Sequence, residues 1–169
     1  MKYTYLINFI IFLGKIFLFF ITKSYALLIS SLYNLAIGIA KLKTNSFKVK
    51  EVSICVIIAS ILFIIYSIWI IITNKQVHYD LYTSLLIATI TFYDIIYSIY
   101  GIIKYKTKQY KLMKQVSLAT SLISLQLTQS AILSFTTVTD NSFYNGLIGI
   151  LAGISALIIG IIINNREQI

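Results

Sequence analysis

Long apolar runs separated by short polar segments dominate the chain. Five runs reach the ~17–25 residues that a helix needs to cross a bilayer, and the run at 25–40 is shorter. The runs lack regular alternation and exceed the roughly ten residues of a transmembrane β-strand. Because helices satisfy their own backbone groups in lipid, we expect an all-α transmembrane bundle. The six predicted spans lie at about 4–22, 25–40, 52–73, 81–103, 115–135 and 146–163.

Positively charged residues between the runs predict an orientation. If all six runs span, only Lys23 and Lys75 fall on one side, and every other positive residue outside the spans falls on the opposite side. The cytoplasmic side carries the excess, so both termini are predicted to be cytoplasmic. An alternative has five spans, with 25–40 lying flat at the interface. The residues on the predicted cytoplasmic side are Lys2, Lys41, Lys43, Lys48, Lys50, Lys104, Lys106, Lys108, Lys111, Lys114 and Arg166.

Composition supports one integral membrane domain over residues 1–169. The chain is 59% hydrophobic and only 11% charged, which is too little charge for a water-soluble surface. Its net charge of +9 sits in short lysine clusters between apolar runs, so we expect the lipid bilayer as partner and no nucleic acid. Isoleucine is more frequent than leucine, and lysine nearly replaces arginine, a usage that predicts a bacterial protein. Together with the apolar runs, it predicts a multi-pass protein of the plasma membrane.

Two charged residues, Lys15 and Asp94, lie deep within predicted spans. A charge at the bilayer centre costs at least ~2.5–3.5 kcal/mol, so such residues usually face the protein interior and find partners. Counting residues from the middle of each run places the two backbones ~6 Å apart in depth, a gap that a lysine side chain covers. An ion pair is therefore feasible. In the alternative, Lys15 reaches to the outer surface and Asp94 is neutral among hydroxyls.

Further polar residues accompany these charges at membrane depth. Asn34 lies in the second run, and Gln126 and Gln129 lie in the fifth. Together with Asp94 they predict a polar cavity that binds a ligand. The alternative is a set of hydrogen bonds between helices that stabilises the bundle, a common role of polar side chains in membranes. The candidate ligand-binding residues are Asp94, Lys15, Asn34, Gln126 and Gln129.

Small residues follow helical spacing in the sixth run. Gly149, Gly153, Ala156 and Gly160 recur at intervals of three and four, which places them on one face. Such a face permits close helix approach, either inside the bundle or in a homodimer. In the third run, Ser53, Ser60 and Ser67 recur every seven residues and predict a second packing seam.

Catalytic and metal-binding patterns are sparse. Cys55 is the only cysteine, so no disulfide or thiolate cluster can form within one chain. His78, Asp80 and Asp140 lie in predicted outer connections, but a closed metal site needs more and better-placed ligands. No serine has the neighbours that nucleophilic catalysis requires. We therefore expect no metal, no cofactor and no enzymatic activity.

The stretch from Ser24 to Leu35 resembles the start of the second helix in cation diffusion facilitators, which also have six spans and cytoplasmic termini. That family binds its ion with Asp and His on this helix and on the fifth. The matching positions here hold Ser30, Tyr33 and Ile37, and the fifth run holds neither Asp nor His, so the ion site is not carried over. Length and span count are also similar to the substrate-binding subunits of energy-coupling-factor transporters, whose first-helix Ala-xxx-Ala motif is absent.

Two functions are compatible with these patterns. One is a transporter or substrate-binding membrane subunit with a polar site near Asp94. The other is a non-catalytic membrane protein that assembles with partner membrane proteins. A ligand-sized cavity that reaches Asp94 would favour the first function, and a closed, dry bundle would favour the second.

Overall fold

The computed structural model describes residues 4–23, 25–42, 49–74, 79–104, 108–136 and 141–165. The regular elements in this part of the chain are all helices, so the all-α prediction is confirmed. The segments 43–48 and 105–107, which contain Lys43, Lys48 and Lys106 of the predicted orientation, lie outside the described residues, as do Lys2, Lys75 and Arg166. The helices are α1 (Thr4–Thr22), α2 (Tyr25–Leu42), α3 (Val49–Thr73), α4 (Leu81–Lys104), α5 (Lys108–Thr136) and α6 (Ser142–Asn165).

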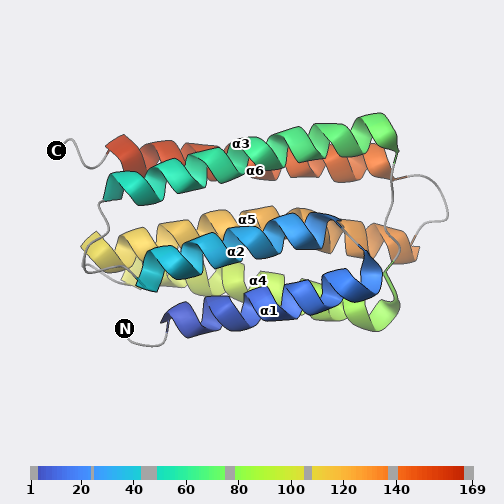
Figure 1. Cartoon of the computed structure of the whole chain (residues 1–169), viewed down its shortest axis with the longest axis horizontal. Coiled ribbons are helices and arrows are strands. Elements are labelled where there is room, and N and C mark those ends of the chain that lie inside the picture. The colour runs from blue at the N-terminus through green and yellow to red at the C-terminus, as the bar shows by residue number, and fades with distance from the viewer. Residues whose placement is uncertain are drawn as a thin grey trace.

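The helix axes are roughly parallel to one line, and helices that follow each other in the chain run in opposite directions (Figure 1). The largest contacts join α3 to α6, α4 to α5, α1 to α2 and α5 to α6. Consequently, the beginning of α1 and the end of α6 lie at the same end of the bundle (Figure 1). Four helices, α3 to α6, are long and apolar enough to cross a membrane by length and composition.

Several helices extend beyond the apolar runs that predicted them, and the largest differences are at the beginnings of α5 and α6. Helix α5 begins at Lys108 rather than near 115, and α6 begins at Ser142 rather than near 146. The N–H of Asn145 donates to the carbonyl of Asn141 at 3.0 Å, so backbone hydrogen bonding starts before the apolar residues do. Hydropathy marks the part of a helix that suits hydrocarbon, whereas hydrogen bonds continue into the polar interface.

Apolar and polar residues are distributed as expected for a protein in lipid. Large aliphatic and aromatic side chains cover the outside of the bundle, and Ile72 and Ile103 are among the most exposed. Many of the buried residues are serine, threonine and asparagine, including Ser30, Ser60 and Thr128. Soluble monomers rarely expose such continuous apolar surface, so this arrangement supports a membrane-embedded protein.

Helices α3 and α6 form a long antiparallel seam. The hydroxyl of Ser53 donates to Asn164 Oδ1 at 3.1 Å at one end, and that of Ser142 donates to Asn74 Oδ1 at 3.0 Å at the other. Between them, Ser60 and Ser67 donate to carbonyls one turn earlier in α3, at 2.7 and 2.8 Å. These hydroxyls are satisfied inside their own helix and present little bulk to α6.

The turns at the end of the bundle away from the beginning of α1 use left-handed backbone conformations. Lys23 has φ 52° and its N–H donates to the Phe19 carbonyl at 2.7 Å. Asn74 has φ 49° and bonds to Ile70 in the same way, at 3.1 Å. Both residues therefore terminate their helices with the hydrogen bond of a left-handed C-terminal cap.

Helix α4 begins with a side-chain cap. Asp80 accepts hydrogen bonds from the N–H of Thr83, at 3.2 Å, and from its hydroxyl. These bonds hold the pKa of the Asp80 carboxyl below its ordinary 3.8. A carboxylate at this position also complements the positive end of the helix dipole.

Candidate functional site

Lys15 of α1 has its ammonium group inside the bundle. Its Nζ donates to the hydroxyl of Ser30 on α2 at 2.6 Å and to that of Ser124 on α5 at 2.9 Å. Lys15 is partly buried and lies near the middle of its helix. Three helices therefore meet at one charged group, and two hydroxyls replace part of its hydration.

Asp94 of α4 lies in electrostatic reach of this ammonium and of a second one, on Lys114. The register of α4 against α5 explains its level. The Ser84 hydroxyl donates to the Ala131 carbonyl at 3.1 Å near one end, and Gly101 meets the Lys114 side chain near the other. Because the helices are antiparallel, Asp94 falls between these contacts, in the middle half of the bundle. The two charges identified from the sequence thus lie within electrostatic range of each other.

Lys114 contributed to the prediction only as one of the positive residues that set the orientation in the membrane. In the structure it is buried. It is 5% exposed, and its Nζ lies 3.4 Å from the centroid of the Tyr97 ring. Its methylenes cross α4 at Gly101, where an added Cβ would come within 2.6 Å of them. A signal for this was present in the sequence: Asp94, Tyr97 and Gly101 follow helical spacing on α4, and the glycine leaves room for a long side chain.

Asn34 is buried, 3% exposed, and its amide donates to the Ser30 carbonyl at 3.0 Å. It therefore belongs to the same turn of α2 that contacts Lys15. The bond lies within one helix, so it supports the backbone of α2 at Ser30.

Gln126 lies on the other side of α5. Its amide donates to Ser130 at 3.4 Å. Its Cγ packs against α6, because a Cβ added at Gly149 would lie 3.1 Å from it. Ser124, two positions earlier, contacts Lys15 of α1 instead. Two positions turn a helix by about 200°, so the two side chains face opposite neighbours. Gln126 and the Lys15–Asp94 pair thus do not share one site, while Gln129 is only partly buried.

The small residues of α6 lie against α3. A Cβ at Gly149 would meet the Ser67 side chain, one at Gly153 would meet Ile64, and one at Gly160 would meet Ile57. Ala156 is completely buried within the same face. The glycine face and the serine seam of α3 therefore form a single interface within the chain.

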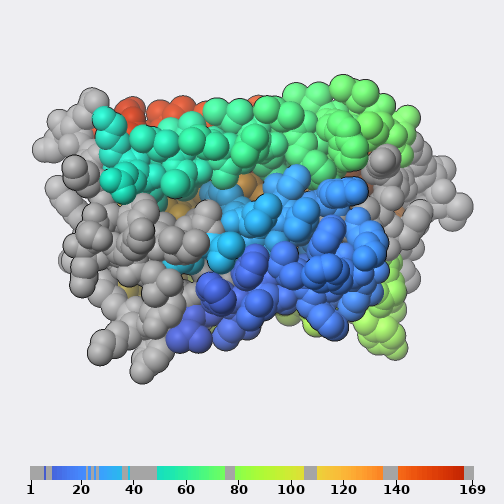
Figure 2. Space-filling view, viewed as in Figure 1, coloured from blue at the N-terminus to red at the C-terminus, as the bar shows by residue number. Residues whose placement is uncertain are grey.

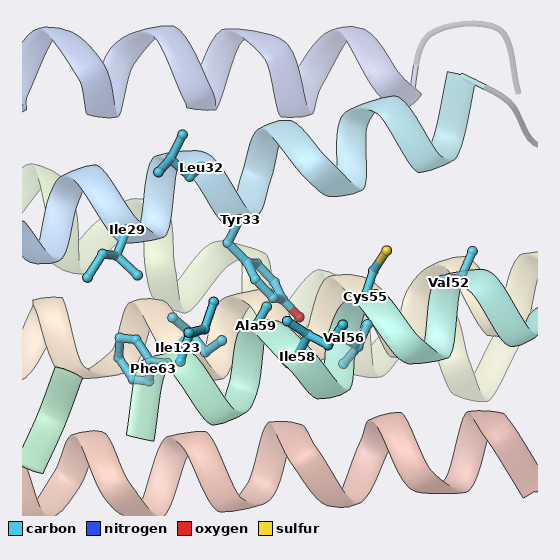
Figure 3. Close-up of a pocket in the computed structure, with 11 residues that line it drawn as sticks. Ile29, Leu32, Tyr33, Val52, Cys55, Val56, Ile58, Ala59, Phe63 and Ile123 are labelled. Atoms are coloured by element: carbon cyan, nitrogen blue, oxygen red, sulfur yellow. The ribbon is translucent and has the colours of Figure 1, made fainter. Parts of the chain in front are cut away.

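A cavity that the sequence did not predict lies between α2 and α3. Its volume is about 510 Å³, its walls are almost entirely apolar, and Ile123 of α5 contributes to its lining. Figure 3 shows the Tyr33 ring reaching from α2 toward α3, where Val56, Cys55 and Ala59 lie. Asp94 is not among its lining residues. Periodicity within each helix cannot reveal this cavity, because it arises from the spacing between two helices.

Metal ligands do not cluster in the part of the chain that the structure describes: no group of three or more His, Cys, Asp or Glu side chains is found there. His78 and Asp140 lie outside the described residues. Comparisons with family models, curated proteins and solved structures gave no match, and neither resemblance noted from the sequence gains support from them.

Proposed function

We propose that the chain is a multi-pass protein of the plasma membrane that acts as a transporter or a substrate-binding transporter subunit. Its binding site for a small solute is the centre formed by Lys15 and Asp94. The carrying observation is that Lys15 is bound by hydroxyls from two other helices, 2.6 and 2.9 Å away, beside a carboxylate. Charged groups at this depth are costly and usually mark solute or ion pathways.

The charge of this centre favours a solute with an anionic group. Two ammonium groups, on Lys15 and Lys114, act on the single carboxylate of Asp94. The centre therefore has an excess of one positive charge in an environment of low dielectric constant. A carboxylate or phosphate would balance that excess, and the hydroxyls of Ser30 and Ser124 could turn to accompany it.

A six-span topology with cytoplasmic termini belongs to this proposal. Helix α1 has 19 residues and α2 has 18, lengths of about 28 and 27 Å, close to the ~30 Å of the hydrocarbon core. Ser30, Ser31 and Asn34 of α2 are buried against other helices, which favours a spanning α2 over one lying at the interface. Reporter fusions at residues 1 and 169 test the topology, and opposite locations for the two ends would favour five spans.

Solute binding is testable without knowing the solute. Purified protein in detergent would be heated with a panel of small carboxylates, phosphates, amines and neutral solutes. A ligand at about 100 times its Kd should raise the Tm by about 5–10 °C. We expect an anionic solute to do so, and Lys15→Met to remove the effect.

Lys104→Met is the matched control, because Lys104 is exposed and donates to Tyr100 at 2.7 Å on the outside of α4. Its thermal shifts should equal those of the parent protein. Equal shifts in Lys15→Met and Lys104→Met would remove the centre from the proposal, and shifts confined to amines would reverse the expected charge of the solute.

A second candidate function, assembly with partner membrane proteins, has one specific observation in its favour. Tyr93 is 65% exposed near the middle of α4 and stacks on Tyr97, with their ring centroids 5.9 Å apart. A phenol facing hydrocarbon at this depth gains from a partner that hydrogen-bonds to it. Isolation in mild detergent followed by mass measurement distinguishes the functions: loss of a stoichiometric partner in Tyr93→Phe would support assembly.

A further inference from the structure

The cavity between α2 and α3 contains a buried polar group that the surrounding protein does not satisfy. Tyr33 is 6% exposed, and its hydroxyl makes no hydrogen bond with the described residues. The hydroxyl of the neighbouring Thr120 donates to the Val116 carbonyl at 2.9 Å. An unsatisfied hydroxyl in an apolar environment is costly, because nothing replaces the water it has lost.

The walls around that hydroxyl suit a hydrocarbon chain. Ile29, Val56 and Phe63 line the cavity together with other apolar side chains, and a volume of about 510 Å³ is within the ~300–1,000 Å³ range of ligand sites. The cavity extends along α3 from Val52 to Phe63, about 16 Å at the rise of a helix. It is therefore an elongated groove with one hydrogen-bond donor in its side.

The groove opens toward lipid. Leu32, Ile58 and Leu62 form its rim and are exposed on the outside of the bundle, as is Cys55. Figure 2 shows α3 and α2 as neighbouring bands on this face of the molecule. Helices α2 and α3 contact each other far less than α3 contacts α6, so a chain can enter sideways between them.

The groove combines apolar walls with one hydrogen-bond donor, the Tyr33 hydroxyl. A fatty-acyl chain suits apolar walls, and its ester carbonyl can accept a hydrogen bond. The bilayer supplies such chains on the side where the groove is open, so an acyl chain of a phospholipid matches both features.

We propose that this groove binds one fatty-acyl chain of a phospholipid, with its ester carbonyl accepting a hydrogen bond from the Tyr33 hydroxyl. This site is separate from the centre at Lys15 and Asp94, and it does not depend on that function. The protein would then bind one lipid molecule specifically, in addition to being surrounded by the lipids of the bilayer.

Cys55 is a built-in reporter for the test. It is the only cysteine, it lines the groove and it is exposed, so the rate of its alkylation by a maleimide reports occupation. Delipidated protein in detergent would be titrated with diacyl phosphatidylglycerol and with the dialkyl-ether analogue of equal chain length. The ether analogue lacks the carbonyl and is otherwise closely matched.

We expect the diacyl lipid to slow alkylation at least several-fold at saturation, and to reach half of that protection at a concentration about two- to tenfold below the ether lipid. In Tyr33→Phe the two lipids should protect equally. In Tyr144→Phe, a control at an exposed position of α6, the difference should remain. Ala59→Leu fills the groove and should abolish protection by either lipid.

Several results would overturn this proposal. Alkylation unaffected by lipid would show that no chain enters the groove. Equal protection by both lipids in the parent protein would remove the Tyr33 hydrogen bond. Protection that rises with protein concentration in the absence of lipid would identify a second copy of the chain as the occupant. Because Tyr33→Phe removes one hydroxyl and leaves the ring, it keeps the test usable even if Ala59→Leu does not fold.

Discussion

The antiparallel pairs α3–α6 and α4–α5 solve the same packing problem with different chemistry. In α3–α6, glycines of α6 lie against α3, and the hydroxyls of Ser60 and Ser67 are satisfied within α3 itself. In α4–α5, the glycine at 101 makes room for a charged lysine, and Asp94 lies farther along the same face. One pair is closed by small neutral groups, and the other carries charge into the bundle.

The α3–α6 pair therefore serves mainly to hold the bundle together, whereas the half that contains α4 and α5 is the better place for a solute site. Helix association in lipid depends on close van der Waals contact, which glycine provides at no cost in buried charge. A buried charge adds no comparable stability and requires partners. The charges of Lys15 and Lys114, from α1 and α5, both lie within electrostatic range of Asp94 on α4, and this location makes that half the better candidate for function.

The largest effect should come from overfilling the closed pair. In Gly149→Leu, even the first added carbon would lie 2.9 Å from Ser67 Cβ and 3.1 Å from Gln126 Cγ. We expect a destabilisation of about 3 kcal/mol or more and little folded protein. Yield and Tm in detergent measure it.

Gly14→Leu is the control, because a Cβ at Gly14 meets nothing within 4 Å. It should purify like the parent protein. Gly153→Ala should be milder than Gly149→Leu, since the Ser60 carbonyl is 3.5 Å away and only the Ile64 side chain must move. If Gly149→Leu is as stable as Gly14→Leu, α6 does not pack closely against α3 at Gly149, and the contrast between the α3–α6 and α4–α5 pairs is wrong.

The next largest effect should come from the charged half. Asp94→Asn leaves the Lys15 ammonium without its carboxylate, and Lys15→Met leaves Asp94 with only the Lys114 ammonium. Each change should cost about 2.5–3.5 kcal/mol. The loss in the double variant should be smaller than the sum of the single losses by about 0.5–3 kcal/mol. Thermal or denaturant unfolding in detergent gives the three values. Additive losses would mean that Lys15 and Asp94 act independently and that the hydroxyls alone stabilise the ammonium.

A smaller effect is expected from one hydroxyl. Ser124→Ala removes one of the two acceptors of the Lys15 ammonium, and hydrogen bonds between helices in membranes contribute about 0.6–1.7 kcal/mol. Ser155→Ala is the control, because Ser155 is exposed and donates only to the Leu151 carbonyl of its own helix, at 2.9 Å. A Tm loss that is equal in the two variants would remove Ser124 from the site.

The smallest effect concerns Asp80, which lies outside both pairs at the beginning of α4. Because hydrogen bonds lower its pKa in the folded protein, its contribution is present above the ordinary 3.8 and is lost as the pH falls through the lower folded value. The drop in Tm between pH 6 and pH 3 should therefore be slightly smaller in Asp80→Asn than in the parent. An identical drop in both proteins would assign the acid sensitivity to other carboxyl groups.

Much of the fold could be predicted because the signals are local. Long apolar runs predicted the helices, and the glycine spacing on α6 and the serine spacing on α3 each predicted a packing face. What the sequence could not supply is that these two faces meet each other. That pairing joins residues about a hundred positions apart, such as Ser53 and Asn164, and depends on how the helices assemble.

The candidate site was predictable in part for the same reason. Matching the depths of Lys15 and Asp94 required only a residue count along two helices. Gln126 was grouped with them although it lies about 200° around α5 from Ser124, and that rotation could have been read from the sequence. Lys114 was missed because charge near a helix end was taken as a topological signal. The groove beside Tyr33 has no sequence signal, since it depends on the separation of α2 from α3.

The hydrogen bond from Lys15 to Ser124 has a consequence for biosynthesis. The two residues are 109 positions apart, so at ordinary rates of translation the ribosome needs about 5–20 s to supply the second partner after the first. Until α4 supplies Asp94, α1 lies in the membrane with its ammonium bonded at most to Ser30 of α2. A chain stopped before α4 therefore carries a polar defect in lipid, a recognisable mark of incomplete synthesis that disappears only when the later helices arrive.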